Sequence, residues 1–123
     1  MANPNIVNVT SIYGATTTLI PTGTSATTWT ALTPATGTVN KIDNIVASNV
    51  TGSAAAITVS INSATGGGGT AYRIAYQISV PANASLIIVD KTTALYVGES
   101  QSIVVTSGTT NAIELTASYE AIS

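Results

Sequence analysis

Residues 72–80 read Tyr72-Arg73-Ile74-Ala75-Tyr76-Gln77-Ile78-Ser79-Val80, with a large apolar or aromatic side chain at every second position. Successive side chains of a β-strand point to opposite faces, so this alternation predicts a strand with one apolar and one polar face. Such strands are typical of antiparallel sheets that pack one side on a core. We therefore expect one set of side chains to face inward: Tyr72, Ile74, Tyr76, Ile78 and Val80.

The same period of two recurs along the chain. Residues 113–120 place Ile113, Leu115, Ala117 and Tyr119 on one face, with Glu114, Thr116, Ser118 and Glu120 on the other, and Ile57, Val59 and Ile61 also alternate with polar residues. Residues 39–50 predict a strand with both faces partly covered. The short β-branched segments 86–89 and 103–105 predict strands buried between sheets. Residues 24–32, which are rich in Thr, also favour a strand.

Turn-forming residues separate these segments every 8 to 12 residues or so. They lie at residues 34–37, 51–53, 81–83, 98 and 107–108. Short alternating strands with this spacing predict an all-β fold, an antiparallel β-sandwich or jelly roll. No segment predicts a helix.

Residues 1–23 differ from the rest of the chain, because their apolar residues are thinly spread between Pro4 and Pro21. We interpret residues 1–23 as an extended N-terminal arm, able to pair with another subunit, and residues 24–123 as the β-sandwich body. The alternative is that the first segment adds an edge strand to its own sheet.

The chain of 123 residues has no His, no Cys, three Lys and Arg, and five Asp and Glu. Catalysis near neutral pH usually needs a group that exchanges a proton there, or a nucleophile beside a base. The composition therefore indicates a binding or structural protein, not an enzyme. We predict no catalytic, cofactor-binding or metal-binding residues and no cofactor.

Partners are constrained by charge and hydropathy. A net charge of −2 argues against a nucleic-acid partner, because phosphate binding needs clustered cations. The mean hydropathy is +0.41, yet the longest aliphatic run is Leu86-Ile87-Ile88-Val89, too short to span a membrane. The N-terminus lacks the features of a signal peptide, which indicates synthesis in a cytoplasm. A surface with few charges favours homo-oligomeric assembly, with a soluble monomer as the alternative.

Three groups of residues were considered as sites. The run Gly66-Gly67-Gly68-Gly69 predicts a hairpin tip, since no Lys accompanies it as in phosphate-binding loops. Carboxylates are the side chains that Ca²⁺ prefers, but the spacing of known calcium loops is absent here. Turns and solvated strand faces explain the four candidates: Asp90, Glu99, Glu114 and Glu120. Among the aromatic residues, Tyr72, Tyr76 and Tyr119 are expected in the core, whereas Tyr13 and Trp29 are candidate interface anchors.

Several segments, in order, resemble small β-rich virion structural proteins of tailed bacteriophages, notably those that infect cyanobacteria and other aquatic bacteria. They span nearly the whole chain: residues 6–14, Lys41-Ile42-Asp43-Asn44-Ile45-Val46-Ala47-Ser48-Asn49-Val50-Thr51-Gly52 followed by 56–61, Ile78-Ser79-Val80-Pro81-Ala82-Asn83-Ala84-Ser85-Leu86, Leu95-Tyr96-Val97-Gly98-Glu99-Ser100, and Ala117-Ser118-Tyr119-Glu120-Ala121-Ile122-Ser123. These motifs are strand and turn patterns with no catalytic signature.

The resemblance implies a capsid decoration (cement) protein that binds and stabilises major capsid subunits, located in the virion after assembly in the host cytoplasm. It also implies multiple copies, with a trimer as the expected oligomer. The alternative is a neck, tail or fibre component, which includes a carbohydrate-binding module at the host surface. A surface adhesin-type domain is a further alternative.

Overall fold

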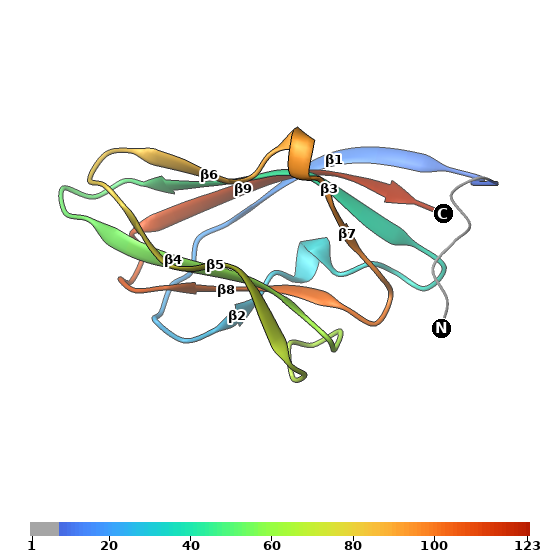
Figure 1. The fold of residues 1–123 in the computed structure, drawn as a ribbon, viewed down its shortest axis with the longest axis horizontal. Helices are drawn as coiled ribbons and strands as arrows, with labels where there is room; N and C mark the ends of the chain where they lie inside the picture. The colour runs from blue at the N-terminus through green and yellow to red at the C-terminus, as the bar shows by residue number, and fades with distance from the viewer. Residues whose placement is uncertain (1–7) are drawn as a thin grey trace.

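A computed structural model describes residues 8–123, which form two facing antiparallel sheets (Figure 1). The first sheet contains, in spatial order, β1 (Ile12–Leu19), β9 (Ile113–Ile122), β3 (Val39–Asn49) and β6 (Ser85–Val89), and β7 (Leu95–Val97) also pairs with β3. The second sheet contains β2 (Thr27–Thr28), β8 (Ser102–Ser107), β4 (Ala55–Asn62) and β5 (Ala71–Val80). The predicted all-β sandwich is confirmed.

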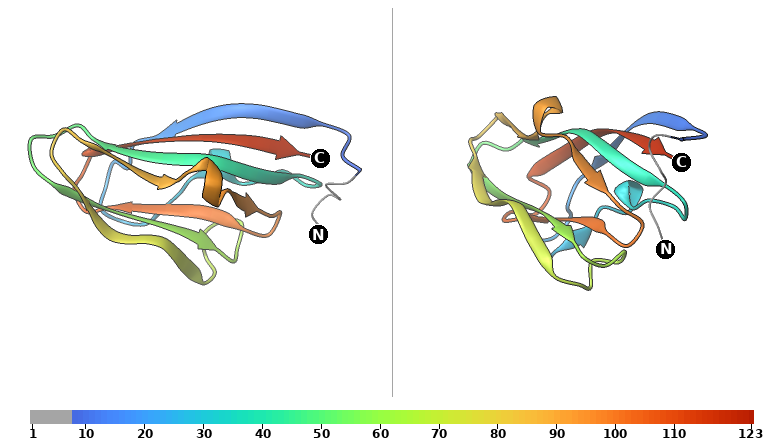
Figure 2. Two further views of the ribbon diagram at one scale, coloured as in Figure 1. Left: turned by 45° about the horizontal axis from the view of Figure 1, so that its top comes forward. Right: turned by 45° about the vertical axis from the view of Figure 1, so that its right-hand side comes forward.

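The path of the chain makes this sandwich a jelly roll. Two connections, β4 to β5 and β6 to β7, join strands of the same sheet. All the remaining connections between β1 and β9 cross from one sheet to the other. The turned views show these crossings at both ends of the sandwich (Figure 2). Repeated crossing of this kind is the wrapping pattern of double-sheet jelly rolls.

The core lies between the sheets and is built from their alternating inward positions. β3 has paired strands on both sides, and its residues are buried or half-buried throughout, as the sequence predicted. In β9, Leu115 and Ala117 are fully buried, and Tyr119 packs against the core at its edge. Residues 103–105 of β8 are also buried, as expected. Removing this apolar surface from water is the main source of stability.

Residues 24–32 form less strand than expected. Only Thr27–Thr28 pair with β8, and the chain then turns into the 3₁₀ helix η1 (Thr30–Leu32). The reason is the core: the Trp29 side chain is buried, with the residue 1% exposed, and Leu32 is fully buried. The backbone N–H of Trp29 donates to the carbonyl of Ile103 at 2.8 Å. The prediction of Trp29 as an interface anchor is wrong, because its side chain closes the core.

Residues 12–19 form an edge strand of the chain's own sheet, the second of the two alternatives for the segment 1–23. β1 pairs with β9 through an uninterrupted antiparallel register, from Ile12 opposite Ile122 to Leu19 opposite Leu115. Residues 1–7 of the predicted arm lie outside the described residues. The boundary at residue 23 and any exchange with a neighbouring subunit stay predictions.

Candidate assembly surface

β5 displays its apolar side chains at the surface. Four of the residues that the alternation placed in the core are exposed by about two fifths or more: Tyr72 at 62%, Ile74 at 38%, Tyr76 at 57% and Ile78 at 41%. Only Val80, at the end of the strand, is fully buried. The predicted core role of Tyr72 and Tyr76 is therefore wrong, although the strand itself is present.

The pairing of β5 with β4 contains two irregularities, and β5 lies at the edge of its sheet. Ile57 lies opposite Ile78, Val59 lies opposite Ala75, and Ser60 lies opposite Arg73, so the register shifts twice within this stretch. Each shift inserts an extra residue into β5 and breaks the alternation of its faces. Gln77 lies at the first irregularity with a positive φ of 48°, and its N–H donates to Thr58 Oγ1 at 2.9 Å.

β6 extends the exposed apolar surface. It follows β5 directly through the turn at residues 81–84, and each of the two is the outermost strand of its sheet. Ile87 is 64% exposed, which contradicts the prediction that residues 86–89 are buried between sheets; Leu86 and Ile88 are half-buried, and only Val89 is fully buried. We refer to the exposed side chains Tyr72, Ile74, Tyr76, Ile78 and Ile87 as the β5–β6 surface. Ile87 lies opposite Val46 on the outer face of the first sheet, whereas Tyr76 borders a hollow on the outer face of the second. Exposed apolar side chains of this size are a common feature of protein-binding sites.

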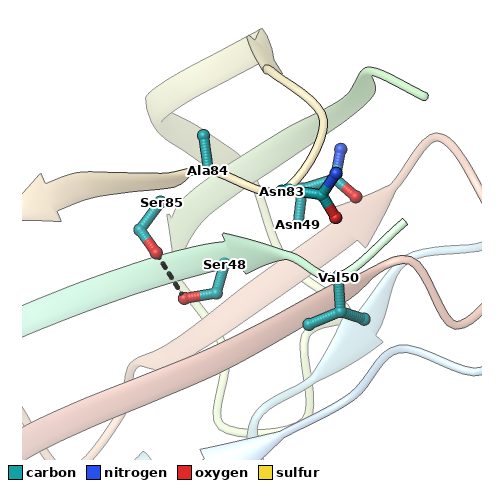
Figure 3. Close-up of a pocket in the computed structure, with 6 residues that line it drawn as sticks. All are labelled: Ser48, Asn49, Val50, Asn83, Ala84 and Ser85. Carbon is teal, nitrogen blue, oxygen red and sulfur yellow. Dashed lines mark hydrogen bonds between the residues drawn. The ribbon is translucent and has the colours of Figure 1, made fainter. Parts of the chain in front are cut away.

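A shallow hollow of about 390 Å³ lies at one end of the sandwich, between the β3–β4 and β5–β6 turns. Figure 3 shows its lining: Ser48, Asn49, Val50, Asn83, Ala84 and Ser85. The Asn49 amide donates to the carbonyls of Ser53 and Val80 at 2.8 and 3.0 Å, and its oxygen accepts from Thr51 N and Oγ1 at 3.0 and 2.7 Å. The two serine hydroxyls bond to each other at 2.8 Å. These groups hold the two turns together, so the hollow is explained by folding.

A second hollow, of about 310 Å³, lies on the outer face of the four-stranded sheet. Its lining includes Thr58, Gln77 and the aromatic ring of Tyr76, over which the Arg73 guanidinium carbon lies 5.3 Å from the ring centroid. A cation over a tyrosine face is a stabilising arrangement. An exposed aromatic ring therefore borders a polar hollow here.

The glycine run forms the tip of the β4–β5 hairpin, as predicted. The Asn62 side chain fastens this tip: its oxygen accepts from the N–H groups of Ala64 and Gly69 at 3.0 and 2.9 Å. Its amide donates to the carbonyls of Gly67 and Gly69 at 3.1 and 3.3 Å. Gly67 has a positive φ of 78°, a conformation that favours glycine.

The four carboxylates are separated: three have a structural contact, and Glu114 is exposed on β9. Asp90 caps the 3₁₀ helix η2 (Lys91–Thr93), accepting from Thr92 Oγ1 at 2.6 Å and from Thr92 N at 2.9 Å, and these bonds lower its pKa from 3.8. Glu99 is buried and accepts a hydrogen bond from Gly37 N. Glu120 lies 3.7 Å from Lys41 Nζ. No cluster of three metal-ligating side chains occurs within residues 8–123.

Of the two candidate interface anchors, Tyr13 alone is at the surface, where it is 73% exposed on β1. Tyr96 on β7 is also exposed, at 46%. No local pattern indicated the β5–β6 surface, since neither Gly nor Pro occurs between Tyr72 and Val80 to mark the two irregularities. In residues 8–123, no helix has the length and apolar character needed to cross a membrane.

Comparisons with known proteins are sparse. Neither a protein-family model nor a curated protein sequence matches the chain. Among solved structures, it is similar to a chain in the cryo-EM structure of the virus-like particle of the extra small virus of the giant freshwater prawn, Macrobrachium rosenbergii. The two chains are 15% identical, with a TM-score of 0.44 over 97% of this chain and 85% of the prawn-virus chain.

Proposed function

We propose that this chain is a non-enzymatic structural protein of a tailed-bacteriophage virion, a capsid decoration protein that binds and stabilises major capsid subunits. The observation that carries the proposal is the β5–β6 surface on a jelly-roll body. Five large apolar side chains are exposed there, where a monomer gains nothing from them. The resemblance of the sequence to phage virion proteins supplies the class of partner, and jelly rolls occur in both capsid and lectin domains.

The mechanism is binding, with no turnover. The β5–β6 surface would pack against a capsid subunit, and Tyr72 and Tyr76 supply large rings with little conformational entropy to lose. Many copies on one particle would bind many equivalent sites, so that weak single contacts add up over the shell.

The first test is the copy number of the chain in purified particles, measured by quantitative mass spectrometry against the major capsid protein. Hundreds of copies per particle are expected for a decoration protein. A few dozen copies or fewer would move the chain to the neck, tail or fibres. Absence from purified particles would contradict the virion function itself.

The second test asks whether the β5–β6 surface makes the contact. The double substitution Tyr72→Thr, Ile87→Thr removes its two most exposed side chains and keeps residues that favour strands. Binding to undecorated capsids, measured by co-sedimentation, should fall at least tenfold. The control Tyr96→Thr changes an exposed aromatic on β7 and should bind normally. Equal binding of both variants would show that the contact lies elsewhere.

Carbohydrate binding at a tail or fibre tip is the second candidate, favoured by the hollow beside Tyr76. Exposed aromatic rings next to polar groups stack on sugars, and Tyr76 is 57% exposed at the rim of that hollow. Glycan-array binding that disappears in Tyr76→Ala would favour this function over decoration. The absence of binding to any host-surface glycan would argue against it.

A further inference from the structure

The outermost strands of the two sheets are not equally protected against pairing with another chain. β2 is only two residues long. β6 is followed by η2, whose residues include the charged side chain of Lys91, before β7 begins. β5 carries two register irregularities and the charge of Arg73. Short strands, interruptions, bulges and charges are the usual means by which sheet edges avoid pairing.

β1 has none of these protections. It is eight residues long and pairs with β9 without any register shift. Residues 12–20 contain no charged residue and no proline. It is the end strand of its sheet, so its second edge has no strand partner among residues 8–123, and Figure 2 shows it at the rim beside β9. A long, regular, uncharged edge is a template for strand addition.

Apolar side chains are exposed along the same edge. Ile12 is 58%, Tyr13 73% and Ile20 45% exposed. The second sheet covers little of β1, because its end strand β2 has only two residues. β1 is therefore open along its edge and over much of its inner face. A second strand alongside β1 would pair with its open edge and cover its exposed apolar side chains.

We propose that β1 pairs antiparallel with β1 of a second copy of this chain, in a register centred on Thr16. This pairing would contribute to the multi-copy assembly proposed above. It depends on that proposed function only for the statement that it occurs in a virus particle. The two five-stranded sheets would join into one continuous sheet across a two-fold axis. An isologous contact of this kind uses the same patch on both copies.

The register follows from which side of the sheet each residue faces. Leu19 lies opposite the buried Leu115, so odd positions face inward, whereas Thr16 and Thr18 lie opposite Ser118 and Thr116 on the outer face. A two-fold axis perpendicular to the sheet preserves the faces, so outer residues must lie opposite outer residues. Centring the axis on Thr16 satisfies this condition.

The same register covers the exposed apolar side chains of the edge. Tyr13 of one copy would lie opposite Leu19 of the other on the inner face, and Ile12 opposite Ile20 on the outer face. Cross-strand pairs of aromatic and β-branched or aliphatic residues are the favourable unit of sheet pairing. No like charges face each other, because residues 12–20 are uncharged. The strand is thus complementary to itself.

The expected dimer is weak. The pairing uses about nine residues on each side, fewer than the roughly 20–30 residues per side of a stable interface. Association should therefore depend on concentration in solution and become strong where many copies are held close together, as on a particle.

The test compares two matched variants by sedimentation velocity over a range of concentrations. Thr16→Lys places two lysines opposite each other at the centre of the pairing, which should weaken dimerisation at least tenfold. The control Thr116→Lys adds the same charge to the same outer face, but on β9, which lies between β1 and β3. It should dimerise like the original chain. Equal loss in both variants would overturn the proposal.

A charge-swap experiment keeps the proposal testable if a single variant folds poorly. Thr16→Lys and Thr16→Glu, each monomeric alone, should form a mixed dimer when combined, because position 16 then pairs opposite charges. Failure to form the mixed dimer, or a trimer that is insensitive to Thr16→Lys, would overturn the pairing. A chain that is monomeric at every concentration but abundant in particles would overturn the pairing and leave the virion function intact.

Discussion

β9 and β5 are both ten residues long and carry the same alternation of apolar and polar residues, yet their burial is opposite. β9 lies between β1 and β3, and Leu115 and Ala117 on its inner face are fully buried. β5 has a strand on one side only, and four of its apolar side chains are exposed. The alternation predicts a strand, whereas burial depends on where that strand lies in its sheet.

This difference divides the molecule into strands that stabilise it and strands that are available for contacts. The core draws mainly on the inner positions of β3, β4, β8 and β9. The edge strands β1 and β5 hold most of the exposed large apolar side chains. If this division is correct, changes in β9 should alter stability, and changes in β5 should alter binding alone.

The largest effect is expected from removing the strand that flanks β9. Deletion of residues 1–23 removes β1 and Leu19, which packs against the core, and turns β9 into an edge. The truncated chain should lose its cooperative thermal transition or aggregate, because a long apolar edge becomes open. The measurement is thermal unfolding by circular dichroism together with light scattering.

A peptide of residues 8–23 supplied in trans provides the control, since it should restore the transition if the missing strand is the cause. A truncated chain that unfolds at the original temperature would show that β9 does not need β1. In that case the segment would behave as a separable arm, the other of the two alternatives for residues 1–23.

The second effect compares single side chains in the two strands. Leu115→Ala in β9 should lower the free energy of unfolding by about 2–5 kcal/mol, the usual cost of a buried cavity. Ile78→Ala in β5 should cost about 1 kcal/mol or less, because the side chain is 41% exposed. Urea unfolding of both variants measures the difference. Similar losses would mean that β5 contributes to the core as much as β9.

The sequence predicted the elements better than their surroundings. Alternation located β4, β5 and β9, and glycine and proline located the turns, because both signals are local. The exposure of β5 depends on its position at the edge of the sheet, together with register irregularities in its pairing with β4, and no residue in 72–80 marks either. Ile87 was expected in the core for the same reason, since its run is apolar but its strand lies at an edge.

Trp29 shows the opposite error. It lies in a segment of Thr residues with no apolar periodicity, so nothing local indicated burial. The chain closes the core there with the 3₁₀ helix η1, which follows Trp29 directly. This turn depends on contact with β8, a strand distant in the sequence, to which the backbone of Trp29 is hydrogen-bonded. The candidate surface was thus misplaced twice: an expected anchor is buried, and expected core residues form the surface. The class of function expected from composition, a binding or structural protein, stays a prediction.

The smallest effect is expected at Asp90, where the edge strand β6 ends. Hydrogen bonds from Thr92 and Thr93 lower the pKa of Asp90 from 3.8, so the folded state favours the carboxylate. Its contribution to stability is therefore present above pH 3.8 and lost as the pH falls through the lowered pKa. Asp90→Asn should unfold at a slightly lower temperature than the original chain at pH 7, and this difference should vanish under strongly acidic conditions. Since Asp90 is fully exposed and Asn is itself a good N-cap, the difference should be far smaller than that of Leu115→Ala. A comparable loss would mean that the end of an edge strand supports the fold as strongly as the middle of β9.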